Sequence, residues 1–168
     1  YDPRAYSYGE DDWPRGKLQL RDSDDGLHIS GVITGVPPNV PEAGWHIHSG
    51  YSCAKDDAVG GHYYAEGSRD PWTSIVYSSD ADGVAIIDQT MSGFSLFGQL
   101  PVNGRAIVVH LPQSMGGTRA GCGELPFQVP ASRMQTAFMP DTPYAIVSLG
   151  DIRGGTGSGI GGTMVVQE

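Results

Sequence analysis

The fold is decided by a stretch near the start of the chain, residues 16–36, which reads GKLQLRDSDDGLHISGVITGV. Apolar and polar residues alternate over Gly16–Asp22 and again over Leu27–Val36, a period of two that is typical of strands with one buried face. Between these runs, Ser23–Gly26 is rich in turn residues and contains an Asp-Gly pair. The stretch therefore predicts a β-hairpin with one face toward a core.

Further short β-prone runs follow, each bounded by clusters of turn residues. We expect strands at Trp45–His48, Ser74–Tyr77, Val84–Asp88, Arg105–His110 and Leu125–Val129, and either a strand or a loop at Phe94–Leu96. The only stretch that could hold a helical turn or two is Ser132–Met139, which lies between prolines. At least seven short strands at this spacing predict an all-β fold, an antiparallel sandwich or barrel.

The end of the chain differs in texture from the rest. We divide the sequence into a β-barrel domain over 1–129, a linker over 130–143 and a β-hairpin extension over 144–168. The two β-prone runs of the extension, Tyr144–Ile152 and Gly162–Glu168, either complete this barrel or begin a following repeat. A G-x-G-x-x-G match between them predicts no nucleotide site, because a β-prone run follows it where that motif requires a helix.

Composition limits the partners that this protein can have. It has 10 basic and 19 acidic residues, a formal net charge of −9 and no basic cluster, which argues against nucleic acid and anionic lipid as partners. No apolar run approaches the roughly 18 to 20 residues of a membrane-spanning helix, so we expect no membrane insertion. The chain opens at Tyr1 without signal-peptide features, and we expect that a secreted parent has already lost its leader.

Four of the five histidines lie in contexts that a metal ion would use. His46 and His48 are two apart on a predicted strand, so both imidazoles lie on one face. His62 follows a Gly-Gly turn, and His110 ends an apolar run. Taken alone, the pair His46 and His48 also fits the polar face of a sheet. His110 alone also fits a hydrogen-bonded histidine of the core. Together the four predict a site for copper, zinc, iron or nickel.

The two cysteines, Cys53 and Cys122, lack the C-x-x-C spacing of zinc and thiol redox sites. We interpret them as one disulfide, with two free buried thiols as the alternative. In the chain-entropy model such a bond would stabilise the fold by roughly 4 kcal/mol, and it would indicate an oxidising compartment.

Five motifs follow one another along the chain: GWHIH at 44–48, Cys53, GGH at 60–62, GRAIVVH at 104–110 and GGTRAGCG at 116–123. In order and approximate spacing they resemble the copper-zinc superoxide dismutases, over about Gly16 to Leu125. The resemblance implies an antiparallel Greek-key β-sandwich of immunoglobulin-like architecture.

The resemblance also implies the residues of a site. It implies one copper ion per domain with ligands at His46, His48, His62 and His110, and a disulfide between Cys53 and Cys122. It implies that Arg119 holds the incoming anion beside copper, where the alternative is a solvated loop residue. In the family mechanism, the counterpart of His62 also carries a proton in the reduced state.

Two departures from the family pattern concern zinc and access to the metal. After four copper ligands only His28 remains, so we expect no zinc. Only eight residues separate His110 from Arg119, where the family has a long charged guiding loop, so we expect a metal more open to solvent. Both departures resemble the copper-only superoxide dismutases and related repeat domains, which are typically extracellular.

Without zinc, another group must orient the far nitrogen of His62, because ligating imidazoles usually donate their second N–H. Asp70 and Glu66 are the nearest carboxylates in sequence. We prefer Asp70, and an ordinary turn role before Pro71 is the alternative.

The sequence therefore predicts a secreted, copper-dependent enzyme that disproportionates superoxide to oxygen and hydrogen peroxide. Because a net charge of −9 would repel superoxide, turnover would require a locally positive approach, for which Arg119 is the nearest cation. The alternative is an extracellular copper-binding or structural repeat domain with little or no activity, whose partners would include neighbouring repeats of the same parent chain. A blue-copper carrier is excluded by the missing Cys, His and Met loop.

Overall fold

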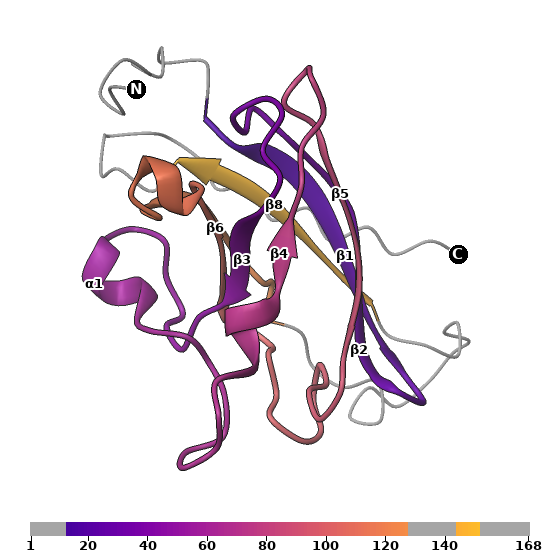
Figure 1. Cartoon of the computed structure of the whole chain (residues 1–168). Helices are drawn as coiled ribbons and strands as arrows, with labels where there is room; N and C mark the ends of the chain where they lie inside the picture. Colours follow the sequence, from indigo (N-terminus) through magenta and orange to yellow (C-terminus); the bar gives the residue numbers. More distant parts are fainter. Residues whose placement is uncertain (1–12, 128–143, 152–168) are drawn as a thin grey trace.

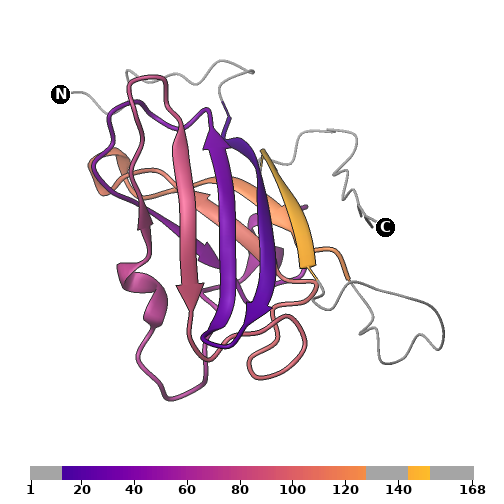
Figure 2. The same cartoon turned by 90° about the vertical axis from the view of Figure 1, so that its right-hand side faces the viewer.

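Eight strands form one continuous antiparallel sheet within the part of the chain that this computed structural model describes, residues 13–127 and 144–151. Their order across the sheet is β4-β3-β6-β7-β8-β1-β2-β5. The strands are β1 (Arg15–Ser23), β2 (Gly26–Thr34), β3 (Ala43–Ile47), β4 (Val76–Tyr77), β5 (Ala85–Met91), β6 (Ala106–His110), β7 (Arg119–Glu124) and β8 (Tyr144–Asp151). The sheet curves so that β1, β2 and β5 form one wall and β3, β4 and β6 the other (Figure 1, Figure 2). The predicted all-β antiparallel sandwich is confirmed.

The predicted hairpin at the start of the chain is also confirmed. β1 and β2 pair over nine residues each, from Arg15 opposite Thr34 to Ser23 opposite Gly26, so that only Asp24 and Asp25 form the turn. Gly26 has a φ of 126°, a conformation that residues with a Cβ rarely adopt. The alternating apolar residues of both strands are fully buried: Leu18, Leu20, Leu27, Ile29 and Ile33.

Three local predictions were wrong. The strand expected at Leu125–Val129 lies earlier, at β7, and Leu125–Phe127 forms no strand. The strand expected from Ser74 is only Val76–Tyr77, because a 3-10 helix, η2 (Pro71–Ser74), occupies the preceding residues. Short helices occur at α1 (Asp56–Val59) and at a second 3-10 turn, η3 (Gln113–Met115), where none was expected. Of the two alternatives for Phe94–Leu96, a strand or a loop, the loop is observed, and Ser95 within it makes an isolated bridge to Pro101.

The last strand of the described residues, β8, is one of the strands that make up the barrel. β8 pairs with β1 on one side and with β7 on the other, and its Val147 and Leu149 are buried in the shared core. The proposed linker 130–143, with its candidate helical stretch Ser132–Met139, and the run Gly162–Glu168 lie outside the described residues. The division of the chain into domain, linker and extension therefore stays a prediction.

The strand β3 separates the core from a second, outer layer. Trp45 and Ile47 point inward and join the main core with residues of β1, β2, β5, β6 and β8. His46 and His48 point to the other face, which the segment 49–74 covers (Figure 1). A smaller buried cluster there comprises Cys53, Val59, Ala106, Val108 and Cys122. Among the described residues, no helix has both the length and the apolar character needed to cross a membrane.

Candidate metal centre

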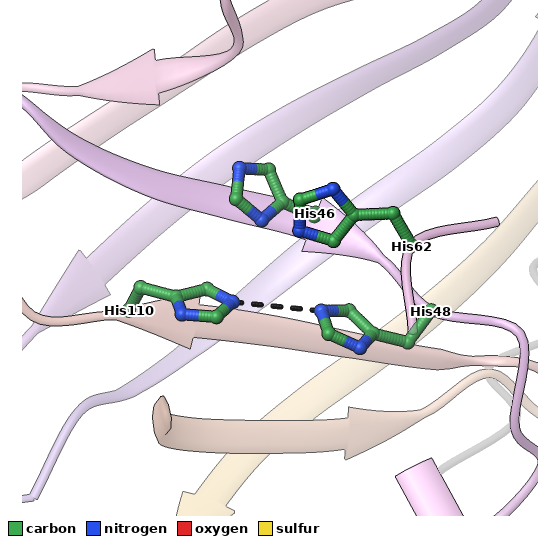
Figure 3. Close-up of side chains that lie close together, drawn as sticks. All are labelled: His46, His48, His62 and His110. Carbon is green, nitrogen blue, oxygen red and sulfur yellow. Dashed lines mark hydrogen bonds between the residues drawn. The ribbon is translucent and has the colours of Figure 1, made fainter. Parts of the chain in front are cut away.

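The four histidines singled out in the sequence come together on this outer face (Figure 3). One ligand nitrogen from each of His46, His48, His62 and His110 lies within 4.8 Å of the others. The ring centroid of His46 lies 4.2 Å from that of His62 and 4.9 Å from that of His110. Within residues 13–127 and 144–151, these four form the one group of three or more side chains of metal-ligating type placed to share an ion.

Backbone pairing explains why distant stretches of chain meet here. β3 lies antiparallel to β6, with His46 opposite Val108, so β6 delivers His110 beside the His46–His48 face. His48 forms an isolated bridge with His62, and the Tyr63 amide donates to the Ile47 carbonyl at 2.9 Å. A shift in register between Val109 and His110 ends the regular pairing of β6 with β7, and such bulges re-aim side chains at sheet ends.

In three of the four rings, Nδ1 is hydrogen-bonded to a group outside the cluster. Nδ1 of His48 lies 3.0 Å from the Gly60 carbonyl oxygen, and Nδ1 of His110 lies 3.0 Å from the Gly117 carbonyl oxygen. Nδ1 of His62 lies 2.7 Å from Oδ2 of Asp70. Because all three partners are acceptors, each Nδ1 carries the hydrogen and each Nε2 keeps a lone pair. The Nε2 atoms of His48 and His110 are 3.5 Å apart (Figure 3), two lone pairs that a cation would hold together.

His46 differs from the other three. Its Nδ1 is the one fully buried side-chain nitrogen or oxygen in the described part of the chain that has no hydrogen-bond partner. On its other side the ring packs against Gly44, where an added Cβ would stand 2.5 Å from Cε1 and 2.7 Å from Nε2 of His46. A buried, unpartnered nitrogen is costly unless an ion or water occupies it. The donor set therefore fits a metal ion that accepts imidazole nitrogen, such as copper.

Burial favours the neutral form of three of the four imidazoles, those of His46, His48 and His110. Burial, together with the charges of the neighbouring His62, His110 and His48, lowers the pKa of His46 from 6.5 to about 3. Burial also lowers the pKa of His48 to about 4, and it lowers the pKa of His110. Since only the neutral ring can ligate, these shifts leave the rings ready for a metal at neutral pH.

Asp70 is fixed at both of its carboxylate oxygens. Oδ2 accepts from Nδ1 of His62, and Oδ1 accepts from the Trp72 amide at 2.8 Å, which caps the helix η2. The contact with His62 and the turn contact before Pro71 are therefore both made by this one residue. Trp72 is fully buried and packs its edge against the His46 ring. Glu66, the other carboxylate considered, is exposed, and no hydrogen bond joins it to His62.

Arg119 begins β7 and lies opposite His110 in the sheet. Its Nη1 donates to the backbone oxygen of Asp56 at 2.8 Å and to Oδ1 of Asp56 at 2.9 Å. Its Nη2 donates to the Gly60 carbonyl, which also accepts from His48. The positive charge of Arg119 lowers the pKa values of His48 and His110, so the guanidinium is part of the electrostatic environment of the rings. No pattern in the sequence indicated its contact with Asp56.

The two cysteines form a disulfide, and the described chain has no free cysteine. The bond joins β7 to the segment that leads through α1 to Gly60 and His62, with the two Cα atoms 5.8 Å apart. The Cys53 amide also donates to the Glu124 carboxylate at 2.6 Å. The segment that carries His62 is therefore anchored to the sheet at Cys53.

The fifth histidine lies elsewhere. His28 is on β2, where its Nε2 lies 2.8 Å from Oδ1 of Asp88 on β5. Nε of Arg21 donates to its Nδ1 at 3.2 Å. Both nitrogens of this ring are engaged on the β1-β2-β5 wall, away from the four-histidine cluster.

Comparisons with known proteins agree with this geometry. The family model for copper/zinc superoxide dismutase (SODC) matches residues 14–126. The chain belongs to the copper/zinc superoxide dismutase family. One curated relative, superoxide dismutase [Cu-Zn] 2 of Mesembryanthemum crystallinum, is 32% identical over 110 residues, which are 59% of this chain and 69% of the relative. A solved structure of the clock protein EA4 has a TM-score of 0.53 at 20% identity, over 72% of this chain and 99% of that one, and it supports the fold alone.

Proposed function

We propose that this protein is an extracellular superoxide dismutase that uses one copper ion and no zinc. The observation that carries the proposal is the buried, unpartnered Nδ1 of His46 within a cluster of four imidazoles. Family membership supports superoxide as the substrate. The disulfide supports an oxidising compartment, because such bonds are rare in the reducing cytosol.

Two observations support the absence of zinc. The outward nitrogen of His62, which a second metal would need, is already hydrogen-bonded to Asp70. The remaining histidine, His28, is engaged by Asp88 and Arg21 on another wall of the barrel. We infer that Asp70 takes over the orienting role for His62, as carboxylates commonly do for ligating imidazoles.

The residues of the chain have two roles in this reaction: Arg119 attracts the anion, and His62 with Asp70 carries a proton. Bound copper would supply the one-electron couple by which one superoxide is oxidised to dioxygen and a second is reduced, with two protons, to hydrogen peroxide. Arg119 offers the incoming anion a permanent positive charge at the edge of the cluster. When its Nε2 is not ligating the metal, His62 can accept a proton there, and Asp70 stabilises the resulting imidazolium through the bond to Nδ1.

The test combines metal analysis with turnover. Copper and zinc are measured per chain, and superoxide consumption is followed before and after copper loading. We expect about one copper per chain, no stoichiometric zinc, and activity that depends on loading. The variant His46→Gln should lose both copper and activity, while the matched variant His28→Gln should keep both.

Each contrary result contradicts a different part of the proposal. Copper binding without superoxide consumption would favour a copper-binding domain without turnover. Zinc in an amount equal to copper would show that the site is not copper-only. Copper retention by His46→Gln would show that the four histidines do not form the copper site.

A further inference from the structure

We propose that Asp56 acts through Arg119 to weaken the attraction of the metal centre for small anions. This inference rests on the proposed role of Arg119 in holding superoxide. It concerns the exposed carboxylate at the start of α1, a residue 63 positions away from Arg119 in sequence.

The contact is a direct ion pair. Oδ1 of Asp56 lies 2.9 Å from Nη1 of Arg119, and the same Nη1 also donates to the Asp56 backbone oxygen. Both hydrogens of Nη1 are therefore used, and the Gly60 carbonyl takes one from Nη2. The contacts of the described residues leave the Nε hydrogen and the second Nη2 hydrogen of the guanidinium for an incoming anion.

The pair leaves the guanidinium oriented but partly neutralised. The Arg119 side chain is 24% exposed and that of Asp56 is 74% exposed, so the carboxylate stands on the solvent side of the pair. An approaching anion therefore meets the field of both charges, and that field is weaker than the field of a lone arginine. With a net charge of −9 on the whole chain, the strength of this local positive charge decides how well anions are drawn in.

The backbone contacts separate orientation from charge. Two carbonyl oxygens, those of Asp56 and Gly60, hold the guanidinium without any negative side chain. Removal of the carboxylate charge should therefore leave Arg119 in place and increase its attraction for anions. The neighbouring Asp57 provides a matched control, because it is exposed, carries the same charge on the same helix and makes no hydrogen bond to Arg119.

The first measurement needs no metal. Phenylglyoxal, which modifies accessible guanidinium groups, is reacted with the metal-free protein, and modification of Arg119 is followed by peptide mass spectrometry. We expect Asp56→Asn to increase the rate roughly threefold, because the carboxylate no longer pairs with Nη1. Asp57→Asn should leave the rate unchanged. An unchanged rate in Asp56→Asn would overturn the inference.

The second measurement uses the copper-loaded protein and azide as the anion. We expect Asp56→Asn to bind azide roughly threefold more tightly at low ionic strength and to lose this gain at about 0.5 M salt, where exposed charges are screened. Asp56→Ala, which also removes the acceptor oxygen, should show the same gain. Weaker azide binding in both variants would overturn the inference, because Asp56 would then hold Arg119 in position.

Failure of this inference can be distinguished from failure of the proposed function. Superoxide consumption is measured in the same variants and should follow the azide affinities. If the wild-type protein consumes no superoxide while the azide and phenylglyoxal effects occur as expected, the proposed function fails and the control of anion binding by Asp56 stands. If wild-type turnover is present and both effects are absent, the inference fails alone.

Discussion

The two faces of β3, together with His48, which directly follows it, have different surroundings. Toward the core, Trp45 and Ile47 are buried among apolar side chains. On the opposite face, His46 and His48 are nearly as buried, but they lie among other imidazoles, and their pKa values are lowered. The core face stabilises the fold by removing apolar surface from water. The metal face instead buries polar rings, and the burial of His46 in particular is compensated only when an ion occupies its Nδ1.

The largest expected contrast comes from truncating one residue on each face. Trp45→Ala should lower the free energy of unfolding of the metal-free protein by about 3–5 kcal/mol, because it leaves a large cavity in the core. The adjacent His46→Ala should cost less, about 1–2 kcal/mol, because the packing lost with the ring is partly offset by removal of an unpartnered buried nitrogen. Urea denaturation of both variants measures this. Equal losses would show that the histidine face is as structural as the core face.

A change of pH distinguishes the two faces of β3, because the apolar core face carries no titratable ring. The pKa of His46 is about 3 and that of His48 about 4 in the folded chain, against 6.5 ordinarily. Between these values the unfolded chain binds more protons than the folded one, so the stability of the metal-free protein falls as the pH is lowered below 6.5. Each ring contributes up to about 1.4 kcal/mol per pH unit.

Urea midpoints between pH 7 and pH 5 measure this dependence, above the range in which most carboxylates titrate. His46→Gln should reduce the slope, because it removes one of the two rings whose pKa is lowered to a known value. A flat profile would contradict the burial of neutral imidazoles on the metal face.

The smallest expected effect concerns the residue that orients His62. Asp70→Asn keeps an oxygen acceptor but removes the negative charge, and it should weaken copper binding by about tenfold, as loss of such outer partners commonly does. The matched variant Glu66→Gln makes the same change of charge at an exposed carboxylate nearby and should leave copper affinity unchanged. Competition with a chelator measures both. Equal effects would indicate that only net charge matters.

The β1–β2 hairpin was predictable because its strands alternate regularly and a turn signal separates them. β7 was not, because its sequence RAGCGE is dominated by small residues with weak β-propensity. That strand forms because it lies between β6 and β8 and because Cys122 is bonded to Cys53. Tertiary position here overrides local preference.

The site was predictable to a different degree. Spacing alone placed His46 and His48 on one face, and local context grouped them with His62 and His110 as candidate ligands. Only the resemblance to a family assigned all four to a single copper ion. Asp70 and Glu66 could not be separated by sequence distance, and the η2 turn that begins at Pro71 is what aims Asp70 at the ring. The pair of Asp56 and Arg119 had no sequence signal, because the two residues meet through a covering segment and a strand far apart in the chain.

The central claim is that four specific imidazoles hold a single copper ion, and electron paramagnetic resonance of the copper(II)-loaded protein tests it most directly. The account predicts one uniform copper signal with hyperfine coupling to imidazole nitrogen, altered by replacing any one of His46, His48, His62 and His110 with glutamine and unaltered by His28→Gln. A signal that survives unchanged in His46→Gln, or that changes in His28→Gln, would contradict it.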